Sequence, residues 1–270
     1  MAYASFHQDP NNPVRQRDIT EGGLSQGKAL AKIYGYMGIA LLITGVVAFL
    51  TAWLVSSQIK LLLDERGFID SNKINFANAW VVGIAAAWII SLIAILILSF
   101  VIPIRAARSG KSLWVPYILY SIFMGIILSA VLLAGIEFWM IGEAFGITCL
   151  AFGAMFAIGW FTKKDISVLG YIAMILLFGV LLAAIVGLIT FLVRGSTANE
   201  RFWFDVIIQG VMILVIMLIT AVDTWRIKKI VANAGESSNI YLFGAYVMYT
   251  DFISLLLRIL LFIARVQGRR

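Results

Sequence analysis

The stretch INFANAWVVGIAAAWIISLIAILILSFVIPI, residues 74–104, contains no Asp, Glu, Lys, Arg or His. A bilayer core is spanned by about 20 apolar helical residues, so this stretch predicts a membrane-spanning helix. A further apolar stretch, residues 240–264, is interrupted only by Asp251 and Arg258. The uncharged runs cover residues 33–59, 74–104, 112–136, 144–162, 166–193 and 206–222. Together with the interrupted stretch, they predict seven spans.

The composition excludes a soluble globular protein. Of the 270 residues, 62% are hydrophobic and 13% are charged, and the mean hydropathy is +0.98. Soluble domains have about 25% charged residues and could not hide this much apolar surface from water. Cys149 is the only cysteine and His7 the only histidine. An intramolecular disulfide and a metal site built from several Cys or His ligands are therefore excluded. Ser-His and Cys-His catalysis is nearly excluded as well.

We therefore expect an all-α integral membrane protein with a seven-transmembrane-helix bundle in residues 30–270. Residues 1–29 are polar and lack the apolar stretch of a secretory signal, so we expect a flexible cytoplasmic tail there. The expected spans are about 33–56, 79–104, 112–135, 143–162, 167–193, 203–225 and 243–264.

The distribution of basic residues predicts the orientation. On the side of the N-terminal tail, 12 Lys and Arg residues flank the spans, and 8 lie on the opposite side. The positive-inside rule then places the N-terminus in the cytoplasm. The basic C-terminus conflicts with seven crossings, and a re-entrant last segment would remove this conflict. The basic residues lie in short loops beside the spans, which suits anionic lipid headgroups, so we expect no nucleic-acid partner.

Three charged residues fall inside or near the ends of the apolar stretches. A charge in the hydrocarbon costs roughly 2.5–3.5 kcal/mol on insertion scales, which makes such residues functional candidates. Asp251 is the strongest, because no loop is close to it in the sequence. Asp223 lies near the end of the sixth span, where an interfacial ion pair with Arg226 or Lys228 is the simplest interpretation. Arg258 lies seven residues after Asp251, on nearly the same helix face.

The relative depth of the two aspartates depends on where the last span begins. If it begins at Ile240, Asp251 lies about 16 Å deep and Asp223 only about 6 Å deep, so the two miss each other. If residues 240–245 instead form a turn and the membrane begins near Tyr246, the depths match. Two facing carboxylates would titrate as a coupled pair. They could also accept Ca²⁺, with backbone carbonyls or water completing a site of modest affinity.

Three segments resemble one known family. They are GWFTKKDISVLG (Gly159 to Gly170), AVDTWRIK (Ala221 to Lys228) and YTDFISLLLRIL (Tyr249 to Leu260). Each segment is loose by itself, but their order and their places at the expected spans resemble the transmembrane Bax inhibitor motif, or Bax inhibitor-1-like, family. The resemblance covers the chain from about residue 30 and is closest to the bacterial members.

The resemblance implies a bundle with the last helix at its centre. It implies that this bundle acts as a pH-sensitive calcium leak, and that a bacterial-type member lies in the inner membrane. It implies that Asp223 and Asp251 form the proton and Ca²⁺ sensor pair. It also implies that an arginine at the end of the second span latches the closed form, and either Arg105 or Arg108 matches that position. Arg258 is an extra charge relative to the family, and a cation on the Asp251 face would repel Ca²⁺.

Two classes of function stay open at this stage. The first is the proton-regulated calcium leak, with Ca²⁺ and H⁺ as ligands and no tightly bound cofactor. The second is a regulatory protein without transport that binds a membrane protease or another integral partner through its N-terminal tail. We expect no enzymatic activity, because no serine, zinc or glycine-flanked aspartate protease motif is present.

Overall fold

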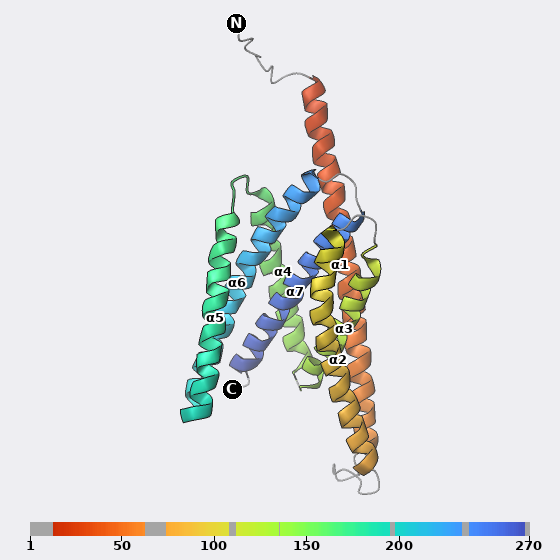
Figure 1. The fold of residues 1–270 in the computed structure, drawn as a ribbon, viewed down its shortest axis with the longest axis vertical. Coiled ribbons are helices and arrows are strands. Elements are labelled where there is room, and N and C mark those ends of the chain that lie inside the picture. The colour runs from red at the N-terminus through yellow and green to blue at the C-terminus, as the bar shows by residue number, and fades with distance from the viewer. Residues whose placement is uncertain are drawn as a thin grey trace.

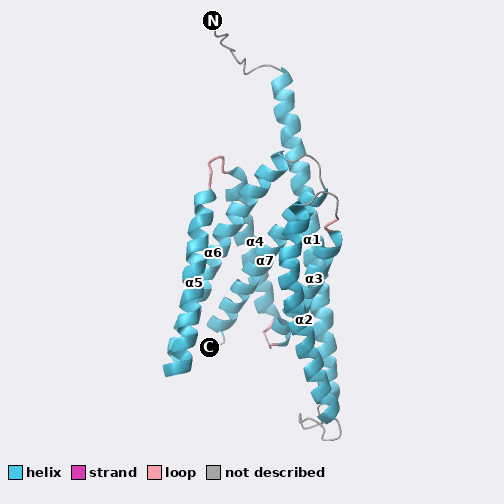
Figure 2. Ribbon diagram, in the orientation of Figure 1, coloured by secondary structure: helices cyan, strands magenta, loops and turns pink. Residues whose placement is uncertain are grey.

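The fold is an all-helical bundle, seen in a computed structural model that describes residues 13–62, 74–107, 112–134, 136–194, 198–233 and 238–267. The described residues form helices and short connections without any strand (Figure 2). Seven of these helices are long and apolar enough to cross a membrane. They are α1 (Pro13–Leu62), α2 (Ile74–Ala107), α3 (Trp114–Leu133), α4 (Phe138–Phe161), α5 (Ser167–Arg194), α6 (Ala198–Asn233) and α7 (Ser238–Gln267). The predicted seven-helix class is confirmed.

The last helix lies at the centre of the bundle. In Figure 1, α1, α2 and α3 form one group, α4, α5 and α6 form another, and α7 runs diagonally between them. It packs against helices of both groups: α1, α2, α3, α4 and α6. Of the seven spans, α7 buries the largest share of its residues, whereas most of α2 and α5 is exposed. The expected central position of the last helix is confirmed.

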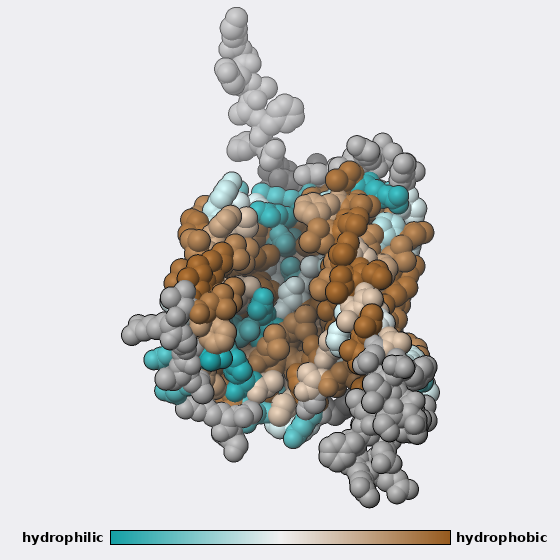
Figure 3. All heavy atoms as spheres, turned by 60° about the horizontal axis from the view of Figure 1, so that its bottom comes forward, coloured by the Kyte–Doolittle hydropathy of each residue, from teal (hydrophilic) through white to brown (hydrophobic). Residues whose placement is uncertain are grey.

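The surface of the bundle is apolar because its surroundings are lipid. Exposed large hydrophobic side chains follow the lengths of α2 and α5, including Phe100, Leu182 and Leu192. In hydrocarbon the backbone must satisfy its own hydrogen bonds, so uncharged runs of this length fold as helices. In Figure 3, brown hydrophobic residues cover both flanks, while hydrophilic residues gather in a hollow between them, at the end of the molecule where α7 ends.

Polar contacts join α1, α3 and α7 inside the bundle. The Thr44 hydroxyl of α1 donates to the Ser121 carbonyl of α3 at 3.0 Å, and it lies 2.6 Å from the Tyr249 hydroxyl of α7. Gly125 of α3 permits this approach, since a Cβ atom there would lie 2.8 Å from the Thr44 carbonyl oxygen. Hydroxyl groups therefore hold α7 on one side.

One expectation about the helix ends is wrong, and one of the two alternatives for the start of the last span is excluded. The flexible tail was expected to reach residue 29, whereas α1 is helical from Pro13. Proline is well suited to a first helical turn. Residues 240–245 are helical instead of forming a turn, because α7 begins at Ser238 and continues unbroken for 30 residues. Such a helix is about 45 Å long, which is enough to cross a whole membrane.

Candidate functional site

The candidate site lies along the seam between the antiparallel helices α6 and α7. Three contacts fix how these helices are aligned. The Thr224 hydroxyl lies 3.8 Å from the Met248 sulfur, the Arg258 guanidinium donates to Gln209 Oε1 at 3.2 Å, and Arg265 pairs with Asp205. The seam therefore extends from the junction of α6 and α7 to the opposite end of the bundle.

Asp251 lies buried at the centre of this seam. It is 9% exposed, and its Oδ2 atom has no hydrogen-bond partner. From α6, Thr220 and Asp223 lie close enough to act electrostatically on its carboxyl. The Thr220 hydroxyl donates to the Ile216 carbonyl of its own helix at 2.9 Å. Asp251 therefore carries a buried carboxyl oxygen without a partner at the centre of the seam.

The two aspartates lie at nearly the same depth. Thr224 of α6 lies level with Met248 of α7, since the two side chains are in contact. Because the helices are antiparallel, Asp251 is then level with a residue of α6 that lies within about one turn of Asp223. With the last span beginning at Ile240, Asp223 was expected too close to the surface, because the sixth helix was expected to end near the basic cluster. In the structure α6 continues to Asn233. The depths therefore match without a turn at 240–245.

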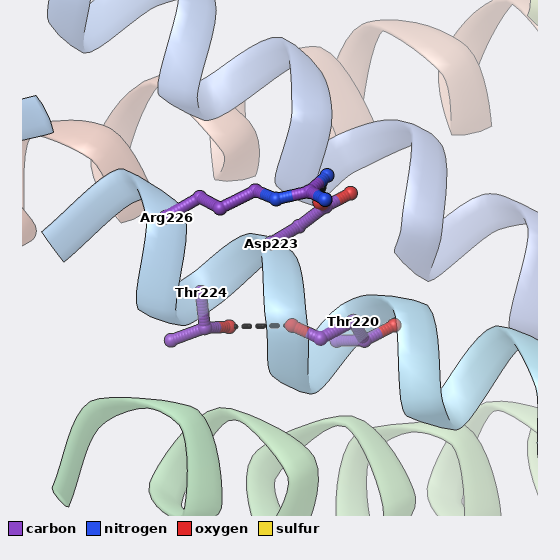
Figure 4. Close-up of polar contacts among 4 residues, drawn as sticks. All are labelled: Thr220, Asp223, Thr224 and Arg226. Carbon is purple, nitrogen blue, oxygen red and sulfur yellow. Dashed lines mark hydrogen bonds and ion pairs between the residues drawn. The ribbon is translucent and has the colours of Figure 1, made fainter. Parts of the chain in front are cut away.

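Asp223 also pairs with a basic residue of its own helix. The Arg226 guanidinium donates to its carboxylate at 3.3 Å, with 57% of the Arg226 side chain and 19% of the Asp223 side chain exposed. Figure 4 shows this pair on a different side of α6 from Thr220 and Thr224. Of the two partners expected for Asp223, the structure has Arg226.

Lys228, the other expected partner, instead ties α6 to the end of α4. Its ammonium group donates to the Trp160 carbonyl at 2.6 Å and lies 5.6 Å from the centre of the Trp160 ring. Beside it, Gly159 lets the two backbones touch, since a Cβ there would lie 2.3 Å from the Ala221 carbonyl oxygen. Helix α4 therefore supports the part of α6 that carries Asp223.

The structure describes only one of the two candidate latch arginines. Arg105 lies half-buried in the last turn of α2, and Arg108 lies outside the described residues. In the described part of the chain, the ion pair of Asp223 is with Arg226, and Asp251 has none. The structure thus does not bring Arg105 into an ion pair with either aspartate.

Arg258 has a neutral partner that sequence reasoning missed. Its guanidinium donates to the side-chain amide oxygen of Gln209. Beyond it, Arg265 pairs with Asp205 of α6, and the Gln267 amide donates to Glu143 of α4 at 3.4 Å. The outer part of the seam is therefore a series of polar contacts, which only the alignment of α6 with α7 could have shown.

Protein groups at the site are too few for a closed metal cage. Over the described ranges, no group of three or more His, Cys, Asp and Glu residues comes together. Asp223 and Asp251 offer hard carboxylate oxygens, which suit Ca²⁺ better than a soft metal. A bound Ca²⁺ would need carbonyl oxygens or water in addition.

Comparison with known proteins identifies the family. The sequence model described as "Inhibitor of apoptosis-promoting Bax1" matches residues 26–268. The chain belongs to the Bax inhibitor family. It is 29% identical over 249 residues to the Inner membrane protein YbhL of Escherichia coli, covering 89% of this chain and 91% of that protein. It is 28% identical over 246 residues to an uncharacterized protein of Borreliella burgdorferi, covering 90% and 94%.

The three segments that resemble the Bax inhibitor family meet in the structure. The segment from Gly159 contacts α6 through Trp160 and Lys228, and its Asp165 lies 4.0 Å from Lys229. The α6 segment in turn meets α7 at Thr224 and Met248, and Met248 directly precedes the third segment. The family segments therefore form one connected unit around the aspartate pair, and the protein is an integral membrane protein.

Proposed function

We propose that this member of the Bax inhibitor family is a pH-sensitive calcium leak gated by Asp223 and Asp251. The observation that supports it best is the burial of Asp251 on the central helix, one turn in depth from a second carboxyl. Charged groups at such depth are costly and are typical of ion and proton pathways. The calcium specificity and the gating do not follow from membership of the family and are part of the proposal.

The proposed mechanism is a competition between protons and Ca²⁺. When protonated, Asp251 is neutral, which suits a closed and apolar seam. When both carboxyls ionise, their repulsion disfavours the closed packing and their oxygens can bind a passing Ca²⁺. The equilibrium between closed and open bundles then follows pH.

A basic latch from the end of α2 is part of the proposal. Where Ca²⁺ is absent, Arg105 or Arg108 would pair with an ionised carboxyl, cancel part of the repulsion between the two aspartates and so oppose opening. Arg226 already serves Asp223 from within α6, so the residue in need of the latch is Asp251. We also propose that the protein resides in the bacterial inner membrane with its N-terminus in the cytoplasm, and that it catalyses no reaction.

The first test is calcium entry into proteoliposomes containing the purified protein. We expect entry at pH 8 to exceed entry at pH 6, with orientation checked by proteolysis. Glu137→Gln is the matched control, because Glu137 is an exposed carboxylate just before α4. This substitution should leave the flux unchanged. Absence of flux at both pH values, in protein shown to be folded, would contradict the proposal.

One observation favours a second candidate function, a regulator that binds an integral partner. Helix α1 begins at Pro13, and its first turns project beyond the bundle (Figure 1), whereas its span begins at Gly27. A projecting helix offers a docking element for another protein. Deletion of residues 1–26 separates the two functions. If the deletion leaves calcium flux intact but abolishes function in cells, the regulator is favoured.

A further inference from the structure

A cavity of about 470 Å³ lies between α1, α2 and α3, away from the seam of α6 and α7. Its walls come from residues 51–55 of α1, residues 79–88 of α2 and Ile126 of α3. All three segments belong to the spans of their helices, so the cavity lies at membrane depth. Cavities of roughly 300–1,000 Å³ hold small molecules in other proteins. This cavity therefore has room for a ligand.

The cavity exists because α3 holds α1 and α2 apart. Helix α1 packs closely on α3 at Gly125, where a Cβ atom would lie 2.8 Å from the Cβ atom of Val47. Helix α2 also packs on α3, but in the described residues α1 and α2 hardly contact each other. Ile126, the residue after Gly125, lines the space between them. The gap is therefore built into the packing of the three helices.

The sequence of α2 shapes one side of the cavity. Two stripes run along this helix, each with members four residues apart, which places them on one face. The stripe of small residues is Ala79, Gly83 and Ala87, and the stripe of large residues beside it is Trp80, Ile84 and Trp88. Small stripes usually let a second helix approach closely. Here a Cβ atom at Gly83 would meet nothing within 4 Å among the described residues, so the stripe forms the floor of an open groove.

The walls of the cavity favour a hydrocarbon occupant over water. Apart from the Thr51 hydroxyl and the indole N–H groups of two tryptophans, the side chains that line it are hydrocarbon. Water in a cavity needs two to four polar partners, and apolar cavities stay dry. Leu54 and Gly83 are exposed, so the cavity opens to its surroundings, which at this depth are lipid. The available occupant is therefore a lipid chain or another apolar helix.

The length of the cavity distinguishes between these two occupants. Ala79 and Trp88 are nine residues apart in the sequence, which corresponds to about 13.5 Å of helix. One leaflet contributes about half of the ~30 Å hydrocarbon core. An acyl chain of one leaflet matches this length, whereas a spanning helix needs a groove along the whole core. Trp80 lies one residue inside the start of the span, where tryptophan is typical of headgroup level.

We propose that this cavity binds one acyl chain of a membrane phospholipid. The chain lies along the small stripe of α2, with its headgroup at the Ala79 end and its methyl end toward Trp88. It fills the gap between α1 and α2 and so fixes the spacing of two helices that have little direct contact. The inference goes beyond the proposed calcium leak and does not depend on it.

Photolabelling of the full chain by lipid tests this site. The delipidated protein is reconstituted into phosphatidylcholine vesicles that contain a trace of the same lipid with a diazirine in its acyl chain. Labelled residues are then mapped by mass spectrometry. Helix α5, which is exposed along its length, reports the labelling by bulk lipid. We expect residues 79–88 of α2 to be labelled several-fold more than α5.

Gly83→Leu fills the cavity, because the new side chain enters open space, and should lower the labelling of α2 to the level of α5. Gly179→Leu is the matched control, because Gly179 is exposed on α5 with open space around it. This control should leave the excess on α2 unchanged. If Gly83→Leu does not fold, Ala87→Leu fills the same cavity from one turn further along α2.

Three results would overturn the inference. The first is equal labelling of α2 and α5 in the native protein. The second is an excess on α2 that persists in a folded variant with the cavity filled. The third is labelling of α2 below that of α5, because a helix of a second copy would then cover the cavity and shield it from lipid.

Discussion

Asp223 accepts a hydrogen bond from Arg226, one turn later on the same helix, at 3.3 Å. The two partners differ in exposure: the arginine is mostly exposed, while the aspartate is mostly buried. An exposed cation that holds a buried carboxylate can be displaced by another cation without refolding of the helix. This relationship makes Asp223 the accessible member of the aspartate pair and Asp251 the enclosed one.

Arg226→Gln should change the calcium response more than the stability. Ion pairs with an exposed partner contribute about 0–1 kcal/mol, so the melting temperature in detergent should change little. Loss of a competing cation should lower the Ca²⁺ concentration that gives half-maximal flux. Lys229→Gln, a neighbouring basic residue that lies near Asp165 instead, is the control. Unchanged calcium dependence in Arg226→Gln would contradict the displacement of Arg226.

Gly159→Ala should destabilise the bundle at the α4–α6 contact. The added Cβ would lie 2.3 Å from the Ala221 carbonyl oxygen and 2.8 Å from the Thr224 Cβ, so the helices must separate. Overpacking of this kind costs about 1–3 kcal/mol. Thermal unfolding in detergent measures it. Gly153→Ala, on the same helix with open space around its Cβ position, should have no such effect. Equal melting temperatures for the two variants would show that the close approach is unimportant.

Thr44→Val should weaken the attachment of α7 to α1 and α3. The substitution keeps the shape of the side chain but removes the partner of the buried Tyr249 hydroxyl. Interhelical hydrogen bonds of this kind contribute about 1 kcal/mol. Thr190→Val is the matched control, because the exposed Thr190 hydroxyl bonds only carbonyls of its own helix among its described contacts. Chemical unfolding of both variants provides the comparison, and equal free energies of unfolding would refute the expectation.

The contribution of Asp165 to the stability of the fold should depend on pH. The backbone N–H of Ser167, followed by its side chain, lowers the pKa of this exposed carboxyl. A lowered pKa in the folded state means that the ionised form stabilises the fold above the unfolded-state pKa. This contribution is lost as pH falls through the folded-state value. Asp165→Asn should therefore melt below the native protein at pH 6, and the difference should shrink below about pH 4. A difference that is constant with pH would contradict this.

Sequence alone predicted the spans because hydrocarbon imposes one simple condition on them. Runs without charge identify what can lie in lipid, and Asp251 stands out because it violates that condition. The helix ends were less predictable, since helices can continue into water. For this reason α6 reaches Asn233 and α1 begins at Pro13.

The partners of the charged residues could not be predicted, because they depend on how helices align. Gln209 lies 49 residues before Arg258, and nothing in either segment indicates the contact. Likewise, the basic cluster after Asp223 contains Arg226, Lys228 and Lys229. Only the structure shows that Arg226 pairs with Asp223 while Lys228 binds the Trp160 carbonyl of α4.

The central claim is that Asp223 and Asp251 form a proton-linked gate for calcium. The most direct measurement is calcium flux into proteoliposomes between pH 6 and pH 8 for Asp223→Asn and Asp251→Asn beside the native protein. Asp205→Asn, at the other end of the same seam, serves as the matched carboxylate control. We predict that both gate variants lose the pH dependence of flux and that Asp205→Asn retains it. Native pH dependence in folded Asp251→Asn would contradict the claim.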